Sequence, residues 1–452
     1  MRKIKYIIPV LLALVIALVS CVDDPNVGSI NPNKYYYDIP DVPVTEDYVV
    51  GVMYHELNET YWFKSTNGVP NFNQPEGYTG SPLLGNPSEK CNPEMPCGNE
   101  TNGGYVIAKD YENNGKILRQ QLDWAKQAGI DFFLVSWNKP VQWNAAVKMD
   151  TFMMNFKNVW QAGDPKIAFI YDCGHLTTRN NPRNDSLHVN FWRVNPPPGR
   201  FVGPYGDGRG TKQTFLDQLD SLKTVFFGEE FYYKVPGKGP LLGLENYRKT
   251  NNVQSTVKDV REVLGNVYLI SPIPERGQDY TSINIIYNMK NSLNVDGKTK
   301  DVYLFRENGE QFGTSQMPFD AMYQPSMLTG NYARHGEDNW RRNFFSIVDM
   351  NWKEWKQEME GRWGGDYIPS VMPAFDNRAF DPDSRIFIHE REVETGELYK
   401  NYANVAKLNA NNTRRIILIN SWNDFKQGSG LEPTEEYGTS YLDFTKKSFK
   451  KN

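Results

Sequence analysis

Residues 114–137 read NGKILRQQLDWAKQAGIDFFLVSW and join a helical pattern directly to a strand pattern. In the first part, apolar residues recur at helical spacing and form one face: Ile117, Leu118, Leu122, Trp124 and Ala125. Gly129 then ends the helix, as glycine often does just past the last turn. The apolar run that follows, residues 130–137, has the pattern of a buried strand. The stretch therefore predicts one helix–strand step of an α/β fold.

The same alternation continues along the whole chain. Eight apolar runs indicate strands, at residues 48–54, 130–137, 166–171, 240–245, 266–273, 319–324, 367–375 and 415–422. Helical patterns lie between most of them, at residues 114–129, 212–227, 255–265, 339–360 and 396–409. Eight such units predict an α/β fold of the (β/α)8 TIM-barrel type with long βα loops. An open doubly wound sheet is the alternative, but no glycine-rich dinucleotide turn follows the first strand.

The N-terminus carries the signals of an exported protein. MRKIK is a positive segment, residues 6–20 are apolar, and Cys21 follows. LVSC resembles a bacterial lipobox, whose cysteine is lipidated, and CVDDPN resembles the surface-export signals of Bacteroidetes lipoproteins. An ordinary cleaved signal is the alternative. We expect a lipoprotein signal peptide and lipobox at 1–21, a flexible tether at 22–46 and a single barrel at 47–452.

A lipid on Cys21 would anchor the protein to the membrane, so the sequence predicts an outer-membrane lipoprotein exposed at the cell surface. The formal net charge is −4, whereas nucleic-acid binding needs a basic surface, so the sequence argues against a nucleic-acid partner. The five histidines are scattered without metal-ligand spacing, and we expect neither a metal nor a cofactor. Cys91 and Cys97 share a loop rich in Pro, Asn and Gly, where either a disulfide or a free pair fits. The sequence assigns no oligomeric state.

Aromatic, acidic and amide residues stand where the predicted strands end. In a (β/α)8 barrel, the carboxyl ends of the strands build the active site. Aromatic rings that stack on sugar faces, with polar groups that bind hydroxyls, form a carbohydrate-like pocket. The alternative is that these residues only cap the end of the barrel and bind no ligand. The candidate ligand-binding residues are Tyr54, His55, Glu56, Trp137, Asn138, Tyr171, Asp172, Glu245, Tyr323, Asp376, Asn377, Trp422 and Asn423.

The segment after the last strand holds the candidate catalytic residues. Cleavage of a glycosidic bond usually needs two carboxylates that flank it. Asp424 can serve as a base or a nucleophile, whereas Gln427 can only form hydrogen bonds. Glu432 lies further along, before Pro433, and is either a brace for the loop or a ligand of the sugar.

Several motifs, in barrel order, resemble one family. The segment SWNDFKQGSGLEPTEEYGTSYL (421–442) resembles the signature of WbsX-like and glycoside hydrolase family 99-like barrels, which read Trp-Asn-Glu-aromatic-x-Glu-Gly followed by Glu-Pro. SPLLGNP (81–87), residues 118–138 and YIPSVMPAFDNR (367–378) resemble other segments of that family. The resemblance implies a (β/α)8 barrel that acts on α-mannosides or related glycans with retention. It also implies a base at Asp424, acting on the 2-hydroxyl of the sugar, and an acid at Gln427.

Both positions depart from the family pattern. Asp424 is one methylene shorter than the expected glutamate, and Gln427 cannot act as an acid, a role that typically contributes about 100- to 10,000-fold. Either another carboxylate replaces it, with Glu56, Asp172, Glu245 and Asp376 as candidates, or ordinary turnover is absent. The sequence therefore leaves three hypotheses: a glycoside hydrolase with a divergent acid/base pair, a surface protein that binds glycans without cleaving them, and a structural envelope lipoprotein.

Overall fold

The computed structural model describes most of the predicted barrel. The described residues are 37–54, 111–137, 152–153, 155–172, 212–245, 253–272, 319–323, 337–362, 364–376, 387–389, 391, 394–424, 428–434 and 436–451. The predicted signal peptide, the lipobox with Cys21, and residues 22–36 of the tether lie outside this set. No helix among the described residues has the length and apolarity needed to cross a membrane.

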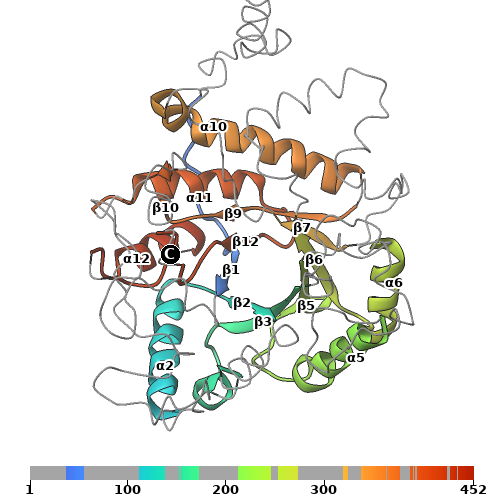
Figure 1. The fold of residues 1–452 in the computed structure, drawn as a ribbon. Helices are drawn as coiled ribbons and strands as arrows, with labels where there is room; N and C mark the ends of the chain where they lie inside the picture. Colours follow the sequence, from blue (N-terminus) through green and yellow to red (C-terminus); the bar gives the residue numbers. More distant parts are fainter. Residues whose placement is uncertain are drawn as a thin grey trace, which may run out of the picture.

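A curved parallel sheet forms the centre of the fold (Figure 1). Its strands are β1 (Val49–Tyr54), β2 (Phe132–Trp137), β3 (Lys166–Asp172), β5 (Gly239–Glu245), β6 (Tyr268–Pro272), β7 (Ala321–Tyr323), β8 (Asp366–Ile368), β9 (Ser370–Val371) and β12 (Ile416–Ile419). Their order is β8-β7-β6-β5-β3-β2-β1-β12-β9, and all neighbouring pairs on this path are parallel. A short strand, β4 (Lys234–Val235), runs antiparallel to β5. A separate hairpin joins β10 (Phe375–Asp376) to β11 (Phe387–His389).

The barrel closes through a single strand that Pro369 interrupts. β8 pairs with β7 on one side, and β9 pairs with β12 on the other, with only Pro369 between them. Proline has no N–H to donate to the ladder, but its carbonyl still accepts a hydrogen bond of 3.0 Å from the amide of Leu418. Counting β8 and β9 as one strand reduces the nine strands on this path to eight. The predicted (β/α)8 barrel is confirmed.

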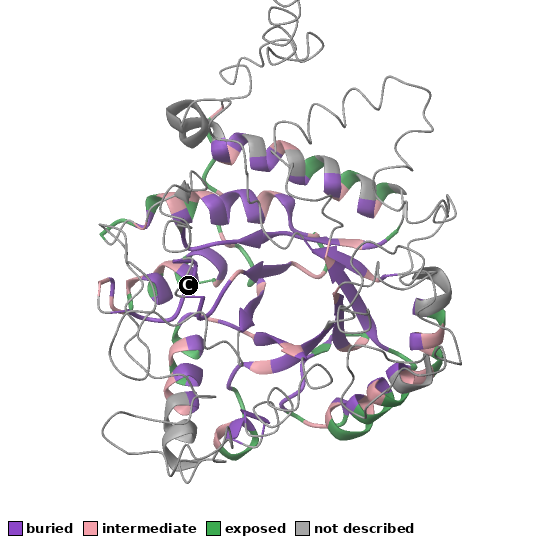
Figure 2. Cartoon of the chain, viewed as in Figure 1, coloured by how far each residue is buried: buried purple, intermediate pink, exposed green. Residues whose placement is uncertain are grey.

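Helices surround the barrel in Figure 1. They are α2 (Tyr111–Gln127), α5 (Lys212–Leu222), α6 (Val253–Leu264), α10 (Glu337–Lys356), α11 (Glu397–Asn409) and α12 (Ser440–Phe449). Two of them continue as π-helical turns, α5 into η5 (Lys223–Phe227) and α10 into η7 (Gln357–Arg362). The first five match the predicted helices closely, whereas α12 was not predicted. The residues coloured as buried in Figure 2 lie along the strands and on the helix faces turned toward them.

The register of the strands separates an inner face from an outer one. Gly51 lies level with Phe132 of β2 and with Leu418 of β12. A Cβ at Gly51 would come within 2.3 Å of the Phe132 ring and 2.8 Å of Leu418, so a larger residue would displace one of them. Because side chains alternate along a strand, Tyr54 belongs to the opposite set, and its hydroxyl reaches Gln121 of α2. The set of Tyr54 therefore faces the helices, and the set of Gly51 faces the barrel interior.

The end of the predicted tether packs against the barrel. Tyr37 donates a hydrogen bond of 2.5 Å to Asp349 of α10. The amide of Val42 donates to the Asn404 side chain of α11 at 3.2 Å, and its carbonyl accepts from Lys407 at 2.6 Å. Burial lowers the pKa of Lys407 to about 8. Residues 37–46 thus make specific contacts with two helices before the chain enters β1.

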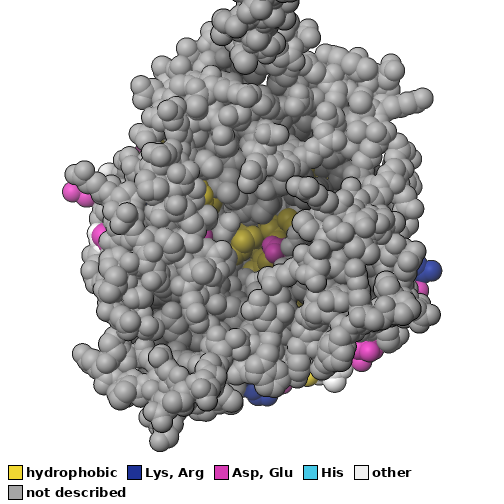
Figure 3. Space-filling model, viewed as in Figure 1, with side chains coloured by type: hydrophobic (Ala, Val, Ile, Leu, Met, Phe, Trp, Pro, Cys, Tyr) yellow, Lys and Arg dark blue, Asp and Glu magenta, His cyan; other side chains and the backbone are white. Residues whose placement is uncertain are grey.

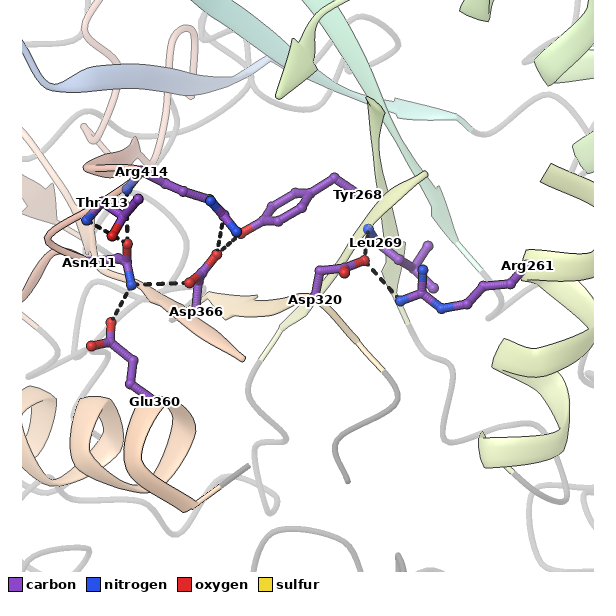
Figure 4. A network of polar contacts seen from close by, with 9 residues as sticks. All are labelled: Arg261, Tyr268, Leu269, Asp320, Glu360, Asp366, Asn411, Thr413 and Arg414. Atoms are coloured by element: carbon purple, nitrogen blue, oxygen red, sulfur yellow. Dashed lines mark hydrogen bonds and ion pairs between the residues drawn. The ribbon is translucent and has the colours of Figure 1, made fainter. Parts of the chain in front are cut away.

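Acidic residues connect the strands at their amino ends, on the side opposite a barrel active site. Asp366 at the start of β8 accepts a hydrogen bond from Tyr268 of β6 at 2.5 Å and pairs with Arg414 before β12 (Figure 4). Asp320, just before β7, accepts from the Leu269 amide at 2.8 Å and from Arg261 of α6 at 2.8 Å. These contacts hold the amino ends of the strands together, and in this fold that end serves stability while the carboxyl ends carry function.

Candidate functional site

The carboxyl ends of the strands meet at one end of the barrel, where this fold places its active sites. Figure 3 shows a hollow at the centre of the barrel as viewed in Figure 1, with hydrophobic side chains and an acidic group inside it. The candidate residues fall into three groups in the structure: those that face the helices, those that face the interior, and those of the segment after β12.

Four of the predicted sugar-stacking rings lie between the strands and the helices. Tyr54 donates a hydrogen bond of 2.7 Å to Gln121 of α2. Tyr171 donates to Gln218 of α5. Trp137 packs 5.5 Å from the Phe226 ring of η5, and Trp422 packs 5.4 Å from the ring of Phe133, measured between ring centroids. All four are buried, and we leave them out of the proposed ligand site.

Glu245 and Tyr323 lie on the inner face at strand ends. The register of the paired strands shows which residues share the inner face with Gly51. They include Gly243 and Glu245 of β5 and Tyr323 of β7. The Tyr323 hydroxyl donates a hydrogen bond of 2.9 Å to Oε1 of Glu245, across the intervening β6. Tyr323 is fully buried and Glu245 only half-buried. This carboxyl group is therefore held in place and remains accessible.

The segment after β12 is tied into a closed loop. The amide of Leu431 donates to the carbonyl of Ser421 at 2.9 Å, and both Ser429 and Gly430 donate to the carbonyl of Asp424 at 3.1 Å. The Asp424 amide in turn donates to the Ser421 hydroxyl at 2.8 Å. A Cβ at Gly430 would meet the Trp422 carbonyl at 3.2 Å, so the close approach of the two arms favours glycine. Asn423 and Asp424 are both buried beside this closure.

Arg391, after β11, holds the second arm of this loop. One of its terminal nitrogens donates to the carbonyls of Gly428, at 3.1 Å, and of Gly430. Its guanidinium stacks over the rings of Tyr437 at 4.1 Å and Tyr441 at 4.7 Å. Stacking on aromatic faces while donating to carbonyls is a geometry that lysine cannot reproduce. Sequence reasoning did not identify Arg391, because nothing near it in the chain indicates the contact.

Glu432 is fully buried on the side of the barrel that faces α2. Its Oε2 accepts a hydrogen bond of 3.0 Å from Gln121, the same side chain that binds Tyr54. Its carbonyl accepts from Tyr437 at 2.6 Å, and its amide donates to the Trp422 carbonyl at 2.7 Å. Burial raises the pKa of Glu432 to about 8, although hydrogen bonding by Gln121 and Trp422 opposes the rise. These contacts make Glu432 a brace between α2 and the loop that carries Asp424.

Several candidate residues cannot be placed in this geometry. His55, Glu56, Asn138, Asn377 and Gln427 lie outside the described residues. Asp172 and Asp376 are described by their backbones only, and Asp172 is in register with Glu245. Among the described residues, no group of three or more His, Cys, Asp or Glu side chains could hold a metal ion.

Comparison with known proteins shows which family the chain belongs to. A family model described as glycosyltransferase WbsX matches residues 220–445, which is half of the 452-residue chain. The chain belongs to the WbsX family. The match runs from α5 to α12 and includes both Glu245 and the loop with Asp424. The resemblance of the sequence to WbsX-like proteins is confirmed.

Individual relatives are more distant. Protein WxcX of Xanthomonas campestris pv. campestris is 30% identical over 107 residues, which are 23% of this chain and 15% of that protein's own length. A solved glycoside hydrolase-like protein has a TM-score of 0.58 at 17% identity, covering 93% of this chain and 99% of the other, and it shows a shared barrel fold. The endo-α-mannosidase of glycoside hydrolase family 99 from Bacteroides thetaiotaomicron has a TM-score of 0.47 at 14% identity, covering 89% and 96% of the two chains.

Proposed function

We propose that this protein is a carbohydrate-active enzyme that hydrolyses an α-mannoside or a related glycan, with Asp424 as its base. The observation that carries the proposal is the closed loop beyond the carboxyl end of β12. A hydrogen bond donated by its amide and two accepted by its carbonyl fix the backbone of Asp424 at the end of the barrel where catalytic groups belong. A group held this firmly is suited to catalysis, because small misplacements can cost about 100-fold in rate.

The chemistry follows from the role that the family resemblance gives to Asp424. Its carboxylate takes the proton of the sugar's 2-hydroxyl, and that oxygen attacks the anomeric carbon with its electron pair. The bond to the leaving oxygen breaks, and the leaving oxygen needs a proton from an acid. Water then opens the strained ring at the anomeric carbon, so two inversions give overall retention. The shorter arm of aspartate requires the sugar to lie closer to the loop than it would for glutamate.

Purified protein incubated with a panel of α-mannan oligosaccharides tests the proposal. We expect new reducing ends from the wild type, and a loss of at least about 100-fold in Asp424→Asn, which has the same shape and no basic oxygen. The matched control is Asp443→Asn, a change at an acid in the first turn of α12. An Asp424→Asn variant that turns over like the wild type would remove the base from the mechanism.

A second candidate is a surface protein that binds glycans without cleaving them. Gln427 favours it, because a glutamine at the position of the family's acid cannot donate a proton to a leaving group. Isothermal calorimetry with the same oligosaccharides separates the two candidates. Binding heat without any product supports the second candidate, and product formation rejects it.

We also propose that a lipid on Cys21 anchors the protein to the bacterial outer membrane, with the barrel facing outward. The lipobox-like LVSC segment supports this proposal. Metabolic labelling with a radioactive fatty acid should mark the wild type and not Cys21→Ala. Added protease should remove the barrel from intact cells. An unlabelled wild type would contradict the anchor, and full protection from protease would contradict surface exposure.

A further inference from the structure

The proposed reaction leaves one role without a residue. A leaving sugar needs a proton, and position 427 holds an amide instead of an acid. Another carboxyl group must therefore reach the bond from elsewhere on the barrel. It has to belong to the inner face, lie at the carboxyl end of a strand, and be accessible to a ligand.

Among the strand residues whose side chains the structure describes, Glu245 meets these conditions. Register places it on the inner face as the last residue of β5. The inward acid of β8, Asp366, lies at the amino end of its strand and is engaged there by Tyr268 and Arg414. Asp320 lies before β7, at the same amino end of the barrel. Glu245 is half-buried, whereas Glu432 is fully buried against α2.

The strand order places Glu245 opposite Asp424. Going one way from β5 to β12, the path crosses β3, β2 and β1. Going the other way, it crosses β6, β7 and the interrupted strand formed by β8 and β9. Three strands separate β5 from β12 on either side, so Glu245 and the loop that follows β12 belong to opposite sides of the barrel. Eight strands about 4.8 Å apart and tilted by about 36° enclose a ring roughly 15 Å across, which leaves room for one sugar between two acids.

An opposite placement suits the proposed chemistry. In an α-mannoside the 2-hydroxyl and the leaving oxygen project from opposite faces of the sugar ring. An acid that reaches inward from across the barrel can therefore approach the leaving oxygen from the face opposite to the base.

The hydrogen bond from Tyr323 determines how Glu245 presents its proton. The Tyr323 hydroxyl donates to Oε1 at 2.9 Å. When Glu245 carries a proton, this hydrogen bond favours Oε1 as the carbonyl oxygen and Oε2 as the oxygen that holds the proton. Tyr323 acts as a positioning residue that fixes the rotation of the carboxyl group.

We propose that Glu245 is the general acid of this protein and replaces the acid missing at Gln427, an inference that rests on the proposed hydrolysis. Oε2 of Glu245 gives its proton to the leaving oxygen as that oxygen takes the electron pair of the broken bond, while Asp424 takes the proton of the 2-hydroxyl. In the second half, Glu245 as carboxylate takes a proton from the attacking water, and Asp424 returns its proton to the sugar oxygen. Both acids end in their starting states, and one water is consumed for each bond cleaved.

The test uses substrates that differ in their need for an acid. One is an α-mannan oligosaccharide with a sugar leaving group, and the other is a dinitrophenyl α-mannoside, whose leaving group departs without a proton. For Glu245→Gln we expect a fall of about 100- to 10,000-fold in kcat/KM on the first substrate and less than about 10-fold on the second. The limb of the pH–rate profile that requires a protonated group should disappear as well. Tyr323→Phe should lower the rate on the oligosaccharide by about 10-fold, with KM little changed.

Matched variants make each outcome decisive. Glu262→Gln, on the exposed surface of α6, is the control and should leave both rates unchanged. Equal losses of Glu245→Gln on both substrates, or no loss on either, would overturn the assignment. The same leaving-group pattern in Asp172→Asn but not in Glu245→Gln would transfer the role to the neighbouring strand and overturn it too. If the wild type cleaves neither substrate, the proposed hydrolysis itself fails. If the wild type cleaves the substrates and Glu245→Gln cleaves them at the same rates, only the assignment of Glu245 fails.

Discussion

The replacement of Glu432 by glutamine tests the buried brace beneath the loop that carries Asp424. Glutamine has the shape of a protonated glutamate and cannot ionise. Burial raises the pKa of Glu432 from an ordinary value of 4.5 to about 8, so the folded protein holds this carboxyl group in its neutral form at pH 7. The unfolded chain, in contrast, releases the proton at its ordinary pKa.

The size and sign of the effect follow from this difference. Because the folded pKa is the higher one, the stabilising contribution is complete below about pH 4.5 and declines as pH rises toward 8. The decline amounts to about 1.4 kcal/mol per pH unit, or about 5 kcal/mol over the whole range. Above pH 8 both states are ionised, and the contribution stays constant.

Urea unfolding of the wild type and Glu432→Gln between pH 5 and pH 9 measures the effect. The two proteins should have nearly equal free energies of unfolding at pH 5, and the variant should be more stable by about 3–5 kcal/mol at pH 8 and above. Glu262→Gln, at an exposed glutamate of α6, should follow the wild type throughout. Parallel curves for the wild type and Glu432→Gln would show that Glu432 is not held neutral and would refute the reasoning.

Three further substitutions probe the contacts that position the site. Arg391→Lys keeps the positive charge but loses the planar guanidinium that stacks on the tyrosine rings. Hydrogen exchange of the loop amides should become faster, and kcat should fall about 10-fold with KM nearly constant. An unchanged exchange rate would contradict this. Asp366→Ala leaves Arg414 without its partner at the amino end of the barrel and should cost about 3 kcal/mol in urea unfolding, with kcat retained at low temperature. Tyr54→Phe removes the hydrogen bond to α2 and should cost about 1–3 kcal/mol, and a stability equal to the wild type would show that this bond contributes nothing.

The sequence was sufficient for the fold because the periodic signals are strong. The predicted run 130–137 contains β2, and the predicted helix 212–227 has the same bounds as α5 with η5. Pro369 lies within a predicted strand, but the sequence did not predict its effect on pairing. The residues before it pair with β7 and those after it pair with β12, and this arrangement depends on the curvature of the whole barrel. The helix α12 was not predicted, and the segment that resembles the family signature, 421–442, includes only its first three residues.

The direction of side chains was the harder problem. A position at a strand end shows that Trp137 or Tyr171 is near the barrel mouth, but a shift of one residue along a strand reverses the face. Tyr171 therefore contacts α5, whereas Glu245 faces the interior. Contacts between distant segments, such as Gln121 with Glu432, leave no signal in a single sequence, because the partners are 311 residues apart.

Time-resolved proton NMR of an α-mannan oligosaccharide, with wild type and Asp424→Asn side by side, addresses hydrolysis by this barrel directly. We predict that the wild type releases a new reducing end that appears first as the α anomer and equilibrates later, while the Asp424→Asn sample shows no new signal over the same time. Release of product at the same rate in both samples, or none from the wild type on any mannoside, would contradict the proposal.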